Sequence, residues 1–248
     1  MMAKYSQFSD DYYSNVNLNT EIELPSERET LLHYFEQVKK SYPSMRNFYS
    51  RERGECVLEE DKDAGHYRWT SVETKRICSG YVNPPSLEAA VEQHEFIFDL
   101  IGYSLSVSPL DCESLNFMLG FDFNYRGNHH ELIADALGVV PSLESFLGFE
   151  GARSISHETA MTMAISSDCR TQFRIQIEPR TSAFHIRTGE YVEEPISVYL
   201  TVRRYGSLES GDRYVEKLQQ LQSVAIDLLE GHLIPHVLQP LQQAISLK

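Results

Sequence analysis

Residues 116 to 125 alternate between two kinds of side chain, and this alternation restricts the fold more than any other feature. Phe117, Leu119, Phe121, Phe123 and Tyr125 fall on one side of an extended chain, and Asn116, Met118, Asp122 and Asn124 fall on the other. Antiparallel sheets that are covered on one side have strands of this kind, with one core face and one polar face. The segment therefore predicts a sheet with two unlike faces.

Two later segments show the same alternation. Phe173, Ile175 and Ile177 oppose Arg174, Gln176 and Glu178, and Ile196, Val198, Leu200 and Val202 oppose Ser197, Tyr199, Thr201 and Arg203. These segments predict half-buried antiparallel strands, because strands of a parallel sheet are apolar on both faces. Two further strand-like runs, roughly 45–60 and 66–82, flank the acidic turn EEDKDAG and predict a hairpin.

Three segments have the apolar spacing of helices. The first begins near Pro25, where Ser26 and Glu29 predict a capping box, and ends at Pro43. The second follows Ser86 and places Leu87, Ala90, Val91, His94, Ile97, Phe98 and Ile101 on one stripe. The third covers about the last 35 residues, and Gly231, Pro235 and Pro240 are expected to bend or break it.

The order of these elements predicts an α+β protein, with antiparallel sheet covered on one face by helices and a long C-terminal helix. The sheet is expected to be single or to consist of two units side by side. The first six elements follow the order of a split βαβ unit, which is a topological analogy. The glycines and proline of GVVPSLESFLGFEG suggest a boundary between an acidic unit, 1–140, and a second unit, 141–248, although one continuous domain is an open alternative.

The chain is acidic, with a formal net charge of −14. Residues 1–149 hold most of this charge, with 12 Lys and Arg against 24 Asp and Glu. Such a surface repels phosphate backbones and anionic lipids, so we expect neither nucleic acid nor membrane as a partner. The opening MMAKYSQFSDDYY lacks the pattern of a signal peptide, and a cytoplasmic location is expected.

The stretch FDFNYRGNHHEL is the strongest candidate for chemistry in the sequence. Asn128 is a natural helix N-cap, and Glu131 stands where it can complete a capping box. His129 and His130 are successive helix positions, which point about 100° apart and do not readily share one ion. We therefore interpret the stretch as a strand-to-helix corner, and a metal or acid/base site is the alternative.

No metal and no cofactor is expected, because the histidine pairs and the cysteines have no usable spacing. His232 and His236 are four residues apart, but Pro235 lies between them. The four cysteines, Cys56, Cys78, Cys112 and Cys169, form no CxxC pair and are expected to be reduced. His94 falls on the apolar stripe of its helix and is interpreted as a core histidine.

Three segments share one layout, from the end of a strand through a Gly, Pro or Asn turn into a helix. They are GYVNPPSLEAA, NYRGNHHELIA and RRYGSLESGDRYVEKL. An internal repeat would produce this layout, and so would the ordinary signals that begin a helix. We favour the second explanation.

All eight basic residues between 150 and 213 are arginines. Arginine suits fixed, bidentate pairing with carboxylate or phosphate groups. If the strands 171–178 and 196–204 are neighbours, Arg174 and Arg203 stand on one polar face and favour an anion between them. The alternative is a set of cross-strand salt bridges to Glu178, Glu190, Glu193 and Glu194.

Two functions follow as hypotheses. The leading one is a noncatalytic cytoplasmic binding or assembly protein, which forms homo-oligomers through its C-terminal helix. The alternative is a small-molecule enzyme or ligand carrier that binds an anionic ligand on the polar sheet face. Its candidate ligand-binding residues are Asp122, Arg174, Tyr199 and Arg203.

Overall fold

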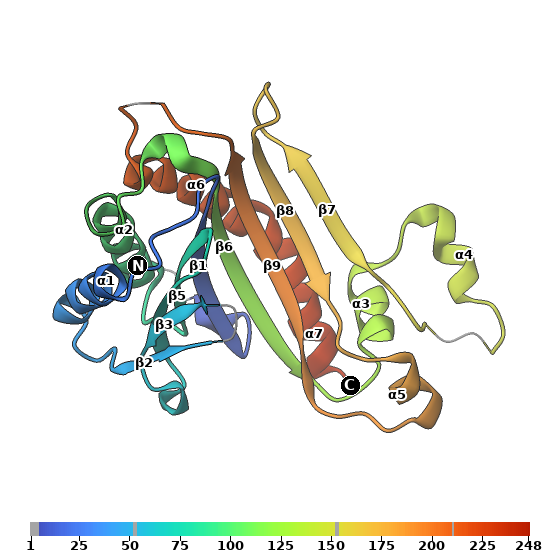
Figure 1. Cartoon of the computed structure of the whole chain (residues 1–248). Coiled ribbons are helices and arrows are strands. Elements are labelled where there is room, and N and C mark those ends of the chain that lie inside the picture. The colour runs from blue at the N-terminus through green and yellow to red at the C-terminus, as the bar shows by residue number, and fades with distance from the viewer. Residues whose placement is uncertain (1–4, 52–53, 152–153, 210) are drawn as a thin grey trace.

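One antiparallel sheet of nine strands organises the protein (Figure 1). The computed structural model describes residues 5–51, 54–151, 154–209 and 211–248. The strands are β1 (Asp11–Thr20), β2 (Asn47–Ser50), β3 (Cys56–Glu59), β4 (Tyr67–Val72), β5 (Arg76–Val82), β6 (Cys112–Tyr125), β7 (Thr159–Ala164), β8 (Thr171–Glu178) and β9 (Glu194–Tyr205). Their order in the sheet is β2-β3-β4-β5-β1-β6-β9-β8-β7.

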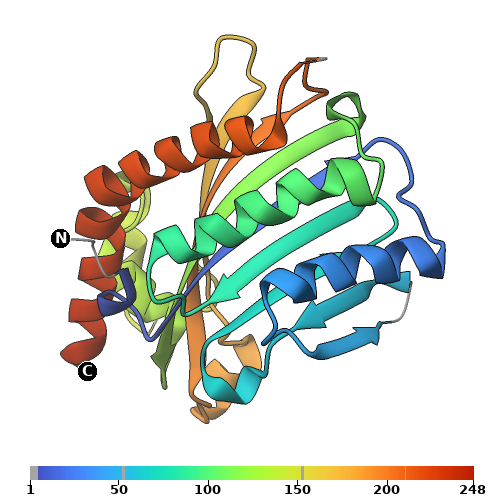
Figure 2. The same ribbon diagram turned by 90° about the vertical axis from the view of Figure 1, so that its left-hand side faces the viewer.

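The long helices lie across one face of this sheet, as Figure 2 shows. They are α1 (Arg28–Ser41), α2 (Leu87–Ser104), α6 (Tyr214–Leu228), a π-helical stretch (Leu229–Leu238) and α7 (Gln239–Ser246). Shorter helices are α3 (His129–Leu137), α4 (Glu144–Leu147) and α5 (Ala183–Thr188), and four 3-10 turns are Tyr5–Gln7, Lys62–Ala64, Pro109–Asp111 and Pro141–Leu143. The predicted α+β class, with antiparallel sheet and helices on one face, is confirmed.

The alternation in the sequence sets the two faces of the sheet. On β6, Phe117, Leu119 and Phe121 are fully buried beneath the helices. On β1, Tyr12, Val16 and Leu18 are buried in the same layer. The intervening positions of both strands face the other way, because side chains alternate along a strand. We call this second side of the sheet the open face.

The two runs predicted as one hairpin form four short strands instead of two long ones. β2 and β3 pair antiparallel, and Gly54 in the connection between them has a left-handed φ of 80°. A second turn follows β4, where the backbone N–H of Glu73 donates to the Arg76 carbonyl oxygen at 2.8 Å. β5 and β6 then flank β1, both antiparallel to it, and α2 joins them. This is the predicted split βαβ arrangement.

The nine strands form one continuous sheet, in which the strands of the first and the second half of the chain lie side by side. β6 pairs with β1 on one side and with β9 on the other. The first half of the chain runs from β1 through α1 and a meander of strands to α2. The second half repeats this order, from β6 through α3 and a meander of strands to α6. GYVNPPSLEAA and RRYGSLESGDRYVEKL lie at corresponding places in these two halves. The division into domains at residue 140 stays a prediction.

The C-terminal helix continues through its glycine and prolines and bends, as Figure 2 shows. Pro235 lies inside the π-helical stretch. The apolar stripe packs within the chain, with Leu218, Leu221 and Ala225 of α6 buried over the sheet. Contact of this helix with a second subunit stays a prediction. None of the described helices combines the length and the apolar character that crossing a bilayer requires.

Candidate functional site

The open face carries all four residues that the sequence suggested for ligand binding. Strand pairing places Asp122 opposite Ser197, and Tyr199 opposite Gly120. Arg174 stands opposite Thr201, and Arg203 stands two pairs further along, opposite Gln172. The predicted neighbourhood of the strands 171–178 and 196–204 is confirmed, because β8 pairs with β9 over its whole length.

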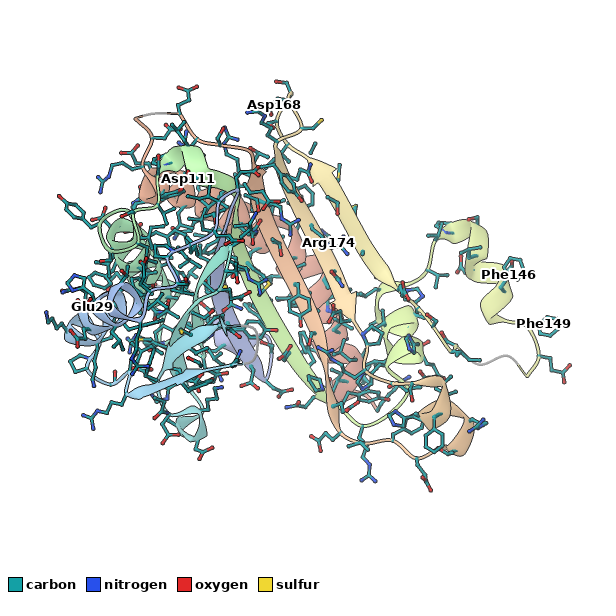
Figure 3. The ribbon with its side chains drawn as sticks, in the orientation of Figure 1. Glu29, Asp111, Phe146, Phe149, Asp168 and Arg174 are labelled. Atoms are coloured by element: carbon teal, nitrogen blue, oxygen red, sulfur yellow. The ribbon has the colours of Figure 1, made fainter. Side chains whose placement is uncertain are left out.

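The two arginines share one hollow of the open face. Thr162, Gln172, Phe173, Arg174, Thr201, Arg203 and Tyr205 line this hollow of about 130 Å³. We call Arg174 and Arg203 the arginine pair. Figure 3 shows Arg174 on β8, with α6 and α7 passing on the other side of the sheet. A volume of this size accommodates a charged group of a ligand, since whole small-molecule pockets measure about 300–1,000 Å³.

Among the described residues, neither member of the arginine pair forms an ion pair with a carboxylate. Arg174 Nε donates to Gln176 Oε1 at 3.0 Å. Arg203 Nη1 donates to the Tyr205 hydroxyl at 2.6 Å, and its Nε is buried without a described partner. Two positive charges thus stand close together without neutralisation, and this arrangement favours an anion.

The predicted salt bridge to Glu178 goes to a different arginine. Glu178 pairs with Arg180 at 3.4 Å, and it reaches Arg174 only through the amide of Gln176. Arg170 pairs with Asp168, and Arg213 pairs with Asp99. In the described part of the chain, Glu190, Glu193 and Glu194 form no ion pair with these arginines. The salt-bridge alternative therefore does not explain the arginine pair.

Gly120 brings two aromatic side chains of the open face together. It lies between Tyr13 and Tyr199 in the pairing of β1, β6 and β9, and it has no side chain to separate them. The two rings meet edge to face, with centroids 6.4 Å apart. A Cβ on Gly120 would lie 2.2 Å from the Tyr13 ring, so only glycine allows this contact. Tyr199 is thereby tied to Tyr13 and not to the arginine pair.

Asp122 of β6 contacts the hydroxyl group of the Tyr13 side chain. The Tyr13 hydroxyl donates to Asp122 Oδ1 at 3.3 Å. Burial raises the pKa of Asp122, and Asp11 on the paired strand adds to this effect. Burial also raises the pKa of Tyr13, with the nearby Asp122 carboxylate as the next cause. Asp122 thus belongs to a different part of the open face from the arginine pair.

The His129–His130 stretch is a structural corner, as the sequence indicated. Asn128 caps α3, and its Oδ1 accepts from the backbone N–H of His130 at 3.1 Å. The Nδ1 atom of His129 accepts from the backbone N–H of Arg180 at 3.0 Å. The Nδ1 atom of His130 accepts from the backbone N–H of His157 at 2.9 Å. Each Nε2 then faces a backbone carbonyl oxygen, of Tyr125 and Thr181 respectively.

These contacts leave no ring nitrogen of the two histidines free for a ligand. Burial lowers the pKa of His129, which keeps its ring neutral. His232 and His236 are exposed on the π-helical stretch. Across the described ranges, no cluster of three or more His, Cys, Asp or Glu side chains could hold a metal ion.

The residues that sequence reasoning missed are on β1 and β4. Asn15 and Asn17 follow Tyr13 on the open face of β1, and Trp69 faces the same side from β4. Their signal was the alternation within DYYSNVNLNT and the position of the single tryptophan of the chain. Pairing with β5 and β6 was needed to bring them together.

Comparisons with known proteins do not identify a family. No protein-family model matches the sequence, and no curated protein matches it. Among solved structures, an alkyldihydroxyacetonephosphate synthase aligns over 95% of this chain and 43% of its own, at 9% identity and a TM-score of 0.18. The chain thus spans less than half of that structure. A likeness this weak carries no argument about fold or function.

Proposed function

We propose that this protein is a noncatalytic ligand-binding protein of the cytoplasm, and that its open face holds a ligand through a carboxylate or phosphate group at the arginine pair. The observation that carries the proposal is the hollow between β8 and β9, where two guanidinium groups lie without a carboxylate partner among the described residues. Planar guanidinium groups bind carboxylate and phosphate oxygens in a bidentate manner.

The surroundings of the arginine pair support binding over catalysis. Gln172, Thr162 and Thr201 contribute amide and hydroxyl groups to the hollow, and none of these is a general acid or base near neutral pH. All four cysteines are free in the structure. Free thiols fit a reducing compartment, which agrees with the proposed cytoplasmic location.

Loss of the arginine pair is expected to remove an anion-dependent rise in melting temperature. At a ligand concentration near 100 times Kd, the wild-type protein should melt about 5–10 °C higher than without ligand. Arg174→Gln and Arg203→Gln should each reduce this rise, and the double variant should abolish it. Thermal unfolding monitored by circular dichroism in phosphate, sulfate and succinate, at constant ionic strength, measures the effect.

Arg187→Gln is the matched control, because Arg187 is an exposed arginine on α5, outside the hollow. This variant should keep the full response. Equal responses of the wild-type protein and the double variant to all three anions would show that the arginines have a structural role only.

A further inference from the structure

A second, larger cleft lies on the open face, over the strands of the first half of the chain. It has a volume of about 500 Å³, which is within the range of sites that bind a whole small molecule. Its lining consists of Asp11, Tyr13, Asn15, Arg51, Val57, Glu59, Lys62, Gly65, Tyr67, Trp69, Val82 and Asp122. None of these residues lines the hollow of the arginine pair.

Trp69 of β4 lines this cleft and packs over Gly80 of the neighbouring strand β5. Trp69 stands opposite Gly80, and a Cβ on Gly80 would lie 2.2 Å from two atoms of the indole. The ring therefore occupies the space that a side chain at position 80 would fill. Asn15 covers Gly80 from the other side, with its Oδ1 only 2.5 Å from the same position. The indole thus packs against the backbone at Gly80 and also lines the cleft.

The rim of the cleft is rich in hydrogen-bond acceptors. Asp11 and Asp122 are directly opposite each other on β1 and β6. Glu59 lies opposite Trp69 on β3, and it pairs with Lys62 at 3.0 Å. Carboxylates accept hydrogen bonds from hydroxyl groups, and bonds to charged groups are stronger than neutral ones. Arg51 and Lys62 also line the cleft, and they pair with Glu55 and Glu59 respectively.

We propose that this cleft binds a neutral sugar ring, with the apolar face of the ring stacked on Trp69. The C–H bonds of a sugar ring carry partial positive charge, and the face of an aromatic ring is negative, so the two attract each other. The hydroxyl groups at the edge of the ring can donate to Asp11, Asp122 and Glu59.

The cleft and the arginine pair lie on the same face and belong to different strands. Tyr13 lines the cleft and contacts Tyr199, which stands beside the strand positions of the arginines. The sugar proposal does not depend on the arginine pair, since no residue is shared between the two sites.

Trp69 makes the proposal directly testable, because it is the single tryptophan of the chain and its fluorescence reports on the cleft alone. The probes are maltose, cellobiose and N,N′-diacetylchitobiose, each titrated to roughly 10 mM, ten times a millimolar Kd. At least one of them should change the intensity or wavelength of Trp69 emission with a saturable dependence. No change with any of the three would overturn the proposal.

Calorimetric titration of variants with the same disaccharide tests the role of the indole. Trp69→Ala should weaken binding by about tenfold or more, as expected for an aromatic group at the centre of a site. Trp69→Phe keeps a flat ring and should weaken it less. Tyr103→Ala, at an exposed aromatic residue of α2 that lines neither site, should leave the affinity unchanged. Unchanged affinity in folded Trp69→Ala would contradict stacking.

The two proposals can fail separately. The double variant of Arg174→Gln and Arg203→Gln should bind the disaccharide with unchanged affinity. Trp69→Ala should keep the phosphate-dependent rise in melting temperature. A response to phosphate and not to the sugars would support the arginine site and contradict the sugar cleft. The reverse result would support the sugar cleft and contradict the arginine site.

Discussion

Replacement of His94 with alanine is expected to lower the free energy of unfolding by about 4 kcal/mol. His94 of α2 is fully buried and lies between two serines of the sheet. Its Nε2 is 3.1 Å from Ser14 Oγ on β1, and its Nδ1 is 2.8 Å from Ser79 Oγ on β5. Alanine would leave a cavity under the helix and would remove the imidazole partner of both hydroxyl groups, of which Ser79 Oγ would keep the hydrogen bond from Gln93 Nε2.

Urea denaturation at pH 7.5 measures this effect, and His232→Ala is the matched control. His232 is exposed on the π-helical stretch, so its replacement should change stability by less than about 0.5 kcal/mol. A loss below about 1 kcal/mol in His94→Ala would show that α2 packs on the sheet without needing the histidine.

Stability is also expected to fall as the pH decreases from 6.5 towards 3. Burial lowers the pKa of His94 from its ordinary value of 6.5 to about 3, so the unfolded chain binds a proton in this interval and the folded protein does not. The stabilisation is complete above pH 6.5 and is lost at about 1.4 kcal/mol per pH unit on the way down. Burial lowers the pKa of His129 and of His157 as well, which steepens the loss.

The share of His94 in this dependence can be isolated with His94→Gln. A series of urea denaturation curves between pH 7.5 and 4.5 should give a shallower slope for this variant than for the wild-type protein, by about the contribution of one proton. His232→Gln should keep the wild-type slope. Parallel slopes for His94→Gln and the wild-type protein would mean that His94 takes up its proton in the folded state.

The open face illustrates where sequence reasoning stopped. The alternation of β8 and β9 placed Arg174 and Arg203 on the polar side of their strands, and the structure confirms this. The alternation does not determine which carboxylate each arginine pairs with. Glu178 has the same parity as Arg174, yet the structure pairs it with Arg180. Side-chain direction is local, whereas ion pairing depends on how the chain turns after the strand.

Local signals were reliable where one short segment determined the outcome. Asn128 caps α3 as predicted, and His94 lies in the core as its helical stripe indicated. The predicted capping box of Ser26 and Glu29 is wrong, because α1 begins at Arg28 with Glu27 as its N-cap and no side-chain cap. A capping motif needs the helix to begin directly after the capping residue, and α1 begins one residue later than Ser26 requires.

By itself, the sequence determined the class of the fold, the two faces of the sheet and the parity of the residues on them. These properties follow from the period of two in a strand and the 3.6-residue turn of a helix, which are set by the backbone. Only the tertiary structure decided that the strands form one sheet, and that Tyr13 meets Tyr199 over Gly120 and Trp69 rests on Gly80. Such contacts join residues that are distant in the chain, and pairing register and close packing, which no local pattern encodes, bring them together.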